Sequence, residues 1–455
     1  MTEVLWHWPE LCNALGVEEF AGPDITGISI DSRTLAPGDL FIAMTGDPGP
    51  RFNPSHRSDR DGHDFIAAAL ERGAAGVLSH DPVTRDCAEL KVDDTLEALW
   101  RLGRAARARL TGPIVAITGS SGKTTTKTWM CTALQAFATA GSLNNHLGVP
   151  LSLARTPRTA TAAVYEIGTN HPGEIAPLSG LVRPDVAVVL NVHPAHAENF
   201  ADLVGLRTEK LSIYKGLTDK GVLVVEDLID TRELPATLAR VTFGDTPGAD
   251  VRLVSEAEGS AEFEISGNRI TARVPGGGGH RARSLAAVLA VLKVLDRDLA
   301  AARNLDAGLV PKGRGNPTQV GGITLIDDSY NANPASMAAA LQGLQRATGR
   351  RFALLGEMLE LGEGGIEHHA RLARYCSGID YVYCVGAGMR PLSEALDPAH
   401  CHYQLVPDDA LLELLCARLQ PGDTLLVKGS NRVFWARGFV DRIIARLSTR
   451  VPDSA

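Results

Sequence analysis

Residues 118–125 form a short segment, Thr-Gly-Ser-Ser-Gly-Lys-Thr-Thr, whose residue types and spacing suit phosphate binding. Glycine at positions 119 and 122 lets backbone N–H groups approach phosphate oxygens closely, and a helix that begins here presents its positive end to them. The ammonium of Lys123 would neutralise terminal phosphate charge, and the hydroxyl of Thr124 would bind Mg²⁺. The general motif has a glycine where this chain has Ile117, but the Gly-Lys-Thr core is intact. The segment predicts a nucleotide site made of Gly119, Ser120, Ser121, Gly122, Lys123, Thr124 and Thr125.

Two elements must hold this loop in place. The apolar run at 114–117 precedes the loop and predicts a strand. After the loop, apolar residues recur at steps of one, three and four, which is typical of one buried helix face. These residues are Trp129, Met130, Ala133, Leu134 and Phe137. We therefore expect the loop between a β-strand and an α-helix.

Polar side chains follow two further predicted strands. Glu166 comes after the strand at 163–165, and His196 lies shortly after the strand at 186–190. Ligands of open α/β sheets lie at the carboxyl ends of strands, so both side chains could converge on a metal held by Thr124. Histidine is the less expected ligand, since Mg²⁺ prefers oxygen. From the residues alone, each fits a structural role as well as a functional one, and we interpret the nearby His193 as a bystander.

The length of 455 residues and the composition indicate a globular α/β protein of three domains, at 1–107, 108–312 and 313–455. The central domain should have a mostly parallel sheet, because strands and helices alternate after the loop. The C-terminal domain repeats strand then helix four times, which predicts a Rossmann-like doubly wound fold. Its first strand is not followed by G-x-G-x-x-G, so we expect no dinucleotide cofactor.

Charge and hydropathy exclude several classes of function. A net charge of -8 and a pI near 5.9 argue against nucleic-acid binding. No run reaches the ~18 apolar residues of a membrane span, and the acidic N-terminus does not resemble a signal peptide. Seven scattered cysteines are typical of reduced thiols. We expect a cytoplasmic protein.

Three other segments are interpreted from their composition alone. Residues 46–62 predict a long exposed loop, and residues 276–279 a flexible glycine run. The helix predicted at 208–215 carries Lys210, which would ordinarily be a solvated surface charge.

The motifs, taken together, extend through most of the chain. They lie at residues 118–127, 143–151, 166–175, 327–334, 355–362 and 427–430. In these segments the chain resembles the Mur ligases, ATP-dependent enzymes of cell-wall precursor synthesis. The similarity is weaker in the first domain.

The resemblance implies an enzyme that uses ATP and Mg²⁺ to join D-alanyl-D-alanine to UDP-N-acetylmuramoyl-tripeptide, acting as a monomer. It implies Lys123, Glu166, His196 and Lys210 as catalytic residues, with Thr124, Glu166 and His196 on Mg²⁺ and a carbamylated Lys210 on a second Mg²⁺. Further ATP contacts are implied for Asn145, Arg314, Asp328, Tyr330, Asn331 and Asn333. Contacts with the UDP-sugar are implied for Asp31, Ser32 and Arg33, which on their own fit an ordinary turn.

Two alternatives are open at the level of sequence. The chain has Arg281 and Ser284 where the family usually has asparagines, and Asn431–Trp435 also departs from the pattern. These departures would fit a related amide ligase that uses another carboxylate or amine. A scaffold without catalysis is the second alternative, and the intact set of phosphate and metal residues argues against it.

Overall fold

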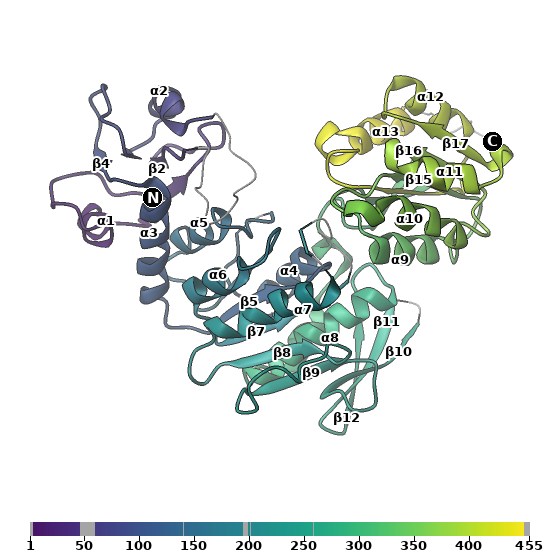
Figure 1. The fold of residues 1–455 in the computed structure, drawn as a ribbon, viewed down its shortest axis with the longest axis horizontal. Coiled ribbons are helices and arrows are strands. Elements are labelled where there is room, and N and C mark those ends of the chain that lie inside the picture. The colour runs from purple at the N-terminus through teal and green to yellow at the C-terminus, as the bar shows by residue number, and fades with distance from the viewer. Residues whose placement is uncertain are drawn as a thin grey trace.

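The protein is described from a computed structural model, which places residues 3–45, 60–139, 141–193, 199–200, 202–257 and 259–449. His196 and most of the predicted loop at 46–62 lie outside these residues. Three sheets organise the described part of the chain, and Figure 1 shows the N-terminal and C-terminal domains standing apart above the central one. The prediction of a three-domain α/β protein is confirmed.

The N-terminal domain contains a parallel sheet whose strand order is β1-β2-β3-β4. Its strands are β1 (Gly27–Ser29), β2 (Asp39–Ile42), β3 (Gly76–Ser79) and β4 (Glu89–Lys91). Its helices are α1 (Trp8–Leu15), α2 (Ile66–Glu71) and α3 (Thr95–Arg109), with a 3-10 turn at Gly62–Phe65. β1 ends early because the carboxylate of Asp31 accepts a hydrogen bond from the Arg33 backbone and turns the chain.

In the central sheet the described strands follow the order β12-β11-β10-β9-β8-β7-β5-β6. The strands from β10 to β6 are parallel, and β11 and β12 add an antiparallel ribbon. The strands are β5 (Ile114–Thr118), β6 (Ala163–Glu166), β7 (Val186–Val189), β8 (Val222–Glu226), β9 (Arg240–Gly244), β10 (Val251–Ala257), β11 (Ser260–Ile265) and β12 (Asn268–Arg273). The helices are α4 (Lys123–Leu134), α5 (Gly148–Ala154), α6 (Ile175–Val182), α7 (Leu203–Leu211) and α8 (Gly279–Val294). The predicted mostly parallel sheet is confirmed.

Helices cover both faces of this sheet. Helices α4 and α8 pack on one face, where Trp129, Met130 and Leu285 are buried. Helices α3, α5 and α6 pack on the other. The prediction that Phe137 shares the buried face of α4 is wrong, because α4 ends at Leu134 and Gln135 takes a left-handed conformation. The chain then reverses, and Phe137 packs in the cluster on the opposite face.

The C-terminal domain is doubly wound, as predicted. Its sheet has the order β13-β14-β18-β15-β16-β17, and of these strands β13 runs antiparallel to its neighbour. The strands are β13 (Asn316–Val320), β14 (Ile323–Asp328), β15 (Arg351–Gly356), β16 (Tyr381–Val385), β17 (Cys401–Gln404) and β18 (Thr424–Lys428). The helices are α9 (Pro334–Leu344), α10 (Gly365–Ala370), α11 (Arg390–Ala395), α12 (Asp409–Arg418) and α13 (Phe439–Ser448).

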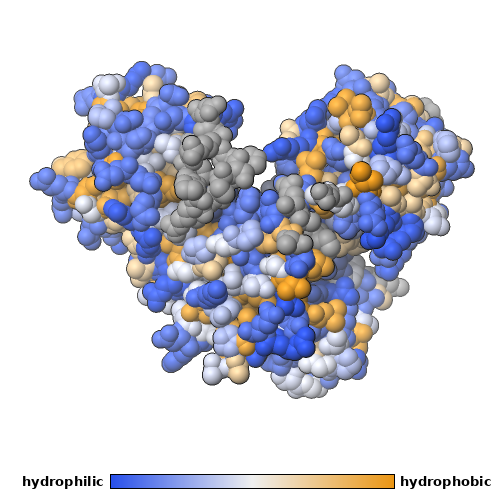
Figure 2. Space-filling view, in the orientation of Figure 1, coloured by the Kyte–Doolittle hydropathy of each residue, from blue (hydrophilic) through white to orange (hydrophobic). Residues whose placement is uncertain are grey.

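Helix α3 joins the N-terminal and central domains. Leu99 and Leu102 are buried in the N-terminal core, whereas Trp100 of the same helix is buried in the central one. The indole of Trp6 also donates to the carbonyl of Ala154 in α5, at 2.9 Å. The C-terminal domain stands apart from this pair, and Figure 2 shows a notch in the surface between the two upper lobes.

Candidate active site

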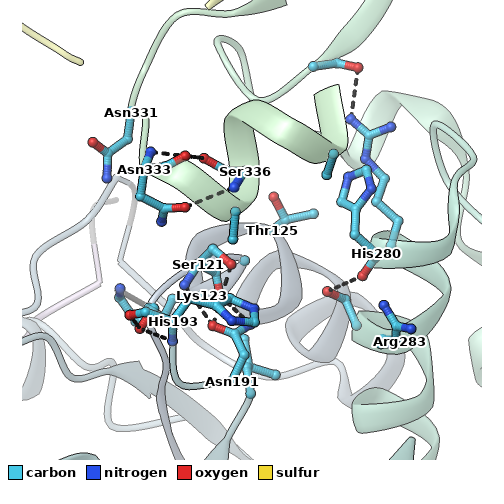
Figure 3. Close-up of a pocket in the computed structure, with 18 of the residues that line it drawn as sticks. Ser121, Lys123, Thr125, Asn191, His193, His280, Arg283, Asn331, Asn333 and Ser336 are labelled. Carbon is cyan, nitrogen blue, oxygen red and sulfur yellow. Dashed lines mark hydrogen bonds between the residues drawn. The ribbon is translucent and has the colours of Figure 1, made fainter. Parts of the chain in front are cut away.

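A cavity of about 1510 Å³ lies between the central and C-terminal domains. The phosphate loop, the carboxyl ends of β6 and β7 and the first turn of α8 form its central wall, and α9 with the segment before it forms the opposite wall. Figure 3 shows Asn331, Asn333 and Ser336 on one side, across from Ser121 and Lys123 on the other. The carboxyl ends of the parallel strands therefore open onto this cavity, as expected for an α/β sheet.

The phosphate loop connects β5 to α4, and hydrogen bonds from the segment after β7 fix its shape. Gly122 caps α4 with φ +79°, a conformation that favours glycine. The Asn191 carboxamide accepts from the Ser121 N–H at 2.9 Å and donates to its carbonyl at 3.2 Å. Ser120 donates its hydroxyl to the carbonyl of His193 at 2.9 Å, so His193, interpreted as a bystander, helps to shape the loop and lines the cavity.

Lys123 folds back over the loop, where its Nζ donates to the Gly119 carbonyl at 2.8 Å. Burial lowers the pKa of Lys123, although the carboxylate of Glu166 acts in the opposite direction. A cation in this position lacks the hydration it has in water, so an anionic ligand would compensate its charge.

Thr124 and Glu166 form the oxygen-rich centre of the site. The Thr124 hydroxyl donates to Glu166 Oε2 at 3.0 Å, and the Asn144 amide donates to Oε1 at 2.8 Å. Glu166 is 4% exposed, and Lys127 Nζ lies 3.7 Å from its Oε2. A hydroxyl and a carboxylate in contact are the ligand types that Mg²⁺ prefers.

Lys210 lies at the end of α7 and lines the same cavity. Its side chain is buried with 2% exposure, so the expectation of a solvated lysine is wrong. Burial first, and then the neighbouring charge of Lys123, lower the pKa of Lys210 to about 7. The adjacent Glu209 instead accepts hydrogen bonds from the Gly173 and Ile175 backbones, at 2.8 and 2.7 Å. Lys210 therefore presents an amine of lowered basicity to the cavity.

The C-terminal wall supplies another set of polar groups. The Arg314 guanidinium donates to the Thr124 hydroxyl at 3.1 Å and lies over the Tyr330 ring, 4.0 Å from its centroid. Lys428 pairs with Asp328 at 2.6 Å, and Asn333 caps α9 by accepting from the Ser336 N–H. The structure thus brings Arg314, Asp328, Tyr330, Asn331 and Asn333 into the cavity wall.

Other predicted residues lie elsewhere. Asp31, Ser32 and Arg33 follow β1 in the N-terminal domain and do not line this cavity, and the Arg33 guanidinium forms a two-point pair with Asp31. The carboxamide of Asn145 accepts from the N–H of Gly148, the first residue of α5, at 2.9 Å. Its neighbour Asn144 reaches Glu166 instead.

Several cavity residues were not predicted as site residues from the sequence. Lys428 belongs to the motif at 427–430, and Lys127, which lies behind Glu166, belongs to the motif at 118–127, but neither was assigned a role in the site. Asn144 sits in an Asn-Asn pair, in which sequence alone does not say which side chain faces the ligand. Asn191 could have been found from the sequence, because a polar residue that directly follows a predicted parallel strand, here the strand at 186–190, indicates a site residue.

A separate group in the N-terminal domain has metal-ligand residue types: Asp61, His63 and His80. Its hydrogen bonds are internal, because His63 Nδ1 pairs with Asp61 at 2.6 Å and His63 Nε2 accepts from the His80 N–H at 3.2 Å. Both ring nitrogens of His63 are thus engaged within the group.

Among the described residues, we find no helix with the length and apolar character needed to span a bilayer.

Comparison with known proteins places this site in context. A family model for the Mur ligase middle domain matches residues 117–292, and one for the Mur ligase glutamate ligase domain matches 313–431. The chain is 34% identical over 438 residues to the UDP-N-acetylmuramoyl-tripeptide--D-alanyl-D-alanine ligase of Escherichia coli K12, covering 91% of this chain and 93% of that protein. It is 32% identical to the Bacillus subtilis 168 protein of the same name, covering 90% and 91%.

Two solved structures are similar over nearly their whole length. MurF from Acinetobacter baumannii has a TM-score of 0.82 at 29% identity, with 97% of this chain and 99% of that chain covered. MurF ligase from Thermotoga maritima, solved in complex with ADP, has a TM-score of 0.77 at 30% identity, with 93% and 98% covered. On this full-length similarity and the matched family models, the chain belongs to the Mur ligase family.

Proposed function

We propose that this protein is the ATP-dependent ligase that adds D-alanyl-D-alanine to UDP-N-acetylmuramoyl-tripeptide in peptidoglycan precursor synthesis. One observation carries the proposal: relatives that bear this name match over about nine tenths of their length and of this chain. The phosphate loop and the charged groups around it support the same reaction class. We further propose a monomer that acts in the cytoplasm, with domains at 1–107, 108–312 and 313–455.

The proposed reaction must turn a carboxylate, which is a poor electrophile, into an amide. The γ-phosphoryl group of ATP passes to the terminal carboxylate of the tripeptide, and the amine of D-alanyl-D-alanine attacks the resulting acyl phosphate. The products are an amide, ADP and phosphate. Two anions must approach each other in the first step, so Lys123 and Arg314 would offset their repulsion from opposite walls of the cavity.

The oxygen atoms of Thr124 and Glu166 fit Mg²⁺, because a hydroxyl and a carboxylate lie in contact and face the cavity. We propose that these two residues and His196 hold the ion. When bound, it would neutralise charge that develops on the transferring phosphoryl group. Asn144 and Lys127 fix the carboxylate of Glu166 in place, and Thr124 is itself fixed as a buried residue in the first turn of α4.

Lys210 is proposed to become an anionic ligand by carbamylation. Its neutral amine would form a C–N bond with CO₂ and release one proton, which converts a buried amine into an anionic carbamate. Burial and the lowered pKa of Lys210 favour the neutral amine near pH 7. The carbamate would hold a second Mg²⁺ beside Lys123.

The remaining predicted contacts are proposed to bind the two substrates. The phosphate loop (residues 119–125), Arg314 and the cavity residues Asp328, Tyr330, Asn331 and Asn333 would bind ATP. Asn145 is also proposed there, although its carboxamide is engaged at α5 in this structure. Asp31, Ser32 and Arg33 would bind the UDP-sugar in the N-terminal domain. The C-terminal domain, by closing over the cavity, would keep water from the acyl phosphate.

The test is release of ADP by the purified protein across a set of UDP-muramoyl peptides, each with and without D-alanyl-D-alanine. Peptides that end in diaminopimelate or in lysine would both be included. We expect release that requires Mg²⁺, one muramoyl tripeptide and the dipeptide together. Activity with a carboxylate that lacks UDP, and none with any muramoyl peptide, would contradict the proposal and support a related amide ligase.

A further inference from the structure

Arg281 is a buried cation whose hydrogen bonds all go to backbone carbonyls. It lies in the first turn of α8 and is 8% exposed. Its Nη1 donates to the carbonyls of Gly276 and Gly277, at 2.5 and 3.2 Å, and its Nη2 donates to those of Arg314 and Gly315, both at 2.8 Å. A buried guanidinium is costly unless its donors are satisfied, so these carbonyls are held firmly around it.

The four carbonyls belong to two different segments of the chain. Gly276 and Gly277 connect β12 to α8 within the central domain, whereas Arg314 and Gly315 lead into β13 of the C-terminal domain. Gly276 and Gly315 have φ of +72° and +81°, and a Cβ at either would lie within 2.8 Å of the guanidinium. Glycine is therefore required at both positions, because the backbone must approach Arg281 closely. Arg281 ties the central domain to the start of its neighbour.

The second of these segments also carries a side chain of the phosphate site. Arg281 holds the backbone carbonyl of Arg314, while the guanidinium of Arg314 donates to the Thr124 and Ser142 hydroxyls at 3.1 and 3.4 Å. The Tyr330 ring packs against the same guanidinium. The backbone of Arg314 and its reach to the phosphate loop are thus fixed from two sides.

We propose that Arg281 is a positioning residue for the nucleotide site. By holding the backbone at 314–315, it keeps the Arg314 guanidinium over Thr124, where the terminal phosphates of ATP would lie. The proposal rests on the proposed function and deepens it: contacts at the junction of the central and C-terminal domains would determine the affinity for ATP. Arg281 acts through Arg314 and not by contact with the phosphates.

A double-mutant cycle tests this relation. The variants are Arg281→Met, Arg314→Met and the pair, with Arg281→Lys as a second substitution that keeps the charge. The first readout is binding of the non-hydrolysable analogue β,γ-imido-ATP with Mg²⁺, which requires no ligase turnover. We expect Arg281→Met to weaken binding about tenfold, Arg281→Lys less, and the pair to bind no more weakly than Arg314→Met alone.

The second readout is kcat and KM in the ligation assay. We expect KM for ATP to rise in Arg281→Met while KM for the muramoyl peptide stays within about twofold. Arg107→Met is the matched control, because Arg107 also donates to backbone carbonyls, of Val182, Leu110 and Arg183, but does not line the nucleotide cavity. It should bind the analogue as the unchanged protein does.

Two results would overturn the proposal. The first is analogue binding that is unchanged in both Arg281 variants. The second is that Arg281→Met weakens analogue binding as much in the Arg314→Met protein as in the unchanged protein, which would mean that Arg281 acts independently of Arg314. An unchanged protein that binds the analogue but ligates nothing would sink the proposed function instead, while the binding cycle would still decide the role of Arg281.

Discussion

At the scale of residues, several cationic side chains gather around Thr124 and the single carboxylate of Glu166. Lys127 lies 3.7 Å from the carboxylate of Glu166, the charge of Lys123 acts on the same carboxylate, and Arg314 donates to Thr124. Such a cluster of cations is costly in a protein interior unless a ligand brings compensating negative charge. The site is therefore built for a polyanion, and ATP with its metal supplies one.

Lys210 gives the first prediction at this scale. If its carbamate is a metal ligand, depletion of CO₂ and bicarbonate should slow turnover, and added bicarbonate should restore it. Lys210→Met should lower kcat about 10- to 100-fold and abolish the bicarbonate response. Lys215→Met, at an exposed lysine on the following turn, should change neither. Turnover that is indifferent to bicarbonate in the unchanged protein would contradict the carbamate.

Glu226 gives a prediction about pH. Burial raises the pKa of Glu226 from 4.5 to about 7. The unfolded chain therefore loses this proton near pH 4.5 while the folded protein keeps it until about pH 7, so stability falls as pH rises between these values. Glu226→Gln should raise the free energy of unfolding by about 1–2 kcal/mol at pH 8 and have little effect at pH 4.

The measurement for Glu226 is urea unfolding of the ligand-free protein at both pH values. Glu394→Gln is the control, since Glu394 is exposed on α11, and it should change stability by less than about 0.5 kcal/mol at either pH. Equal stabilisation by Glu226→Gln at pH 4 and pH 8 would show that titration of this carboxyl is not the cause.

At the scale of elements, the phosphate loop depends on the residue that follows β7. Asn191 holds the Ser121 backbone from both its N–H and its carbonyl. Asn191→Ala should leave β5 and α4 folded but free the loop, and weaken binding of an ATP analogue about tenfold. Titration calorimetry checks this, with Asn268→Ala on β12 as a control. Unchanged affinity would mean that the glycines alone fix the loop.

Elements with a strong periodic signal could be predicted from the sequence. The strands around the phosphate loop lie where the apolar runs indicate, and so do β14, β15, β16 and β18, which cover the apolar runs at 323–326, 352–355, 381–385 and 424–427, because buried parallel strands are apolar throughout. The short strands β4, β13 and β17 lie at sheet edges and were not predicted, since partial exposure weakens the pattern.

Contacts between distant segments could not be predicted in this way. Lys210 has the helical spacing of a surface residue, and only packing against the cavity buries it. The bond between Arg314 and Thr124 joins residues 190 positions apart. The choice of Asn144 over Asn145 depends on where α5 begins, which sequence patterns fix only to within a few residues.

At the scale of the whole molecule, the C-terminal domain has its own cores. Within the described part of the chain, the clusters on the two faces of its sheet contain no residue of the other domains. Leu354→Ala in β15 should therefore lower the stability of this domain by about 2–5 kcal/mol and shift only its transition in calorimetry. Leu102→Ala in α3 is the counterpart and should shift the transition of the other two domains. One shared transition, moved equally by both variants, would contradict independent unfolding.

Helix α3 has a consequence for the evolution of the chain. Its residues are divided between two cores, and its last turn includes Arg107 and Arg109, so an exchange of genetic segments near residue 107 would split a helix that both partners need. A junction near residue 313 crosses only a linker, although it would separate Arg281 from two of the four carbonyls that it holds, those of Arg314 and Gly315. Recombination between relatives should therefore preserve the first two domains as one block and exchange the third. The exchanged third domain must then still present backbone carbonyls to Arg281, as Arg314 and Gly315 do here.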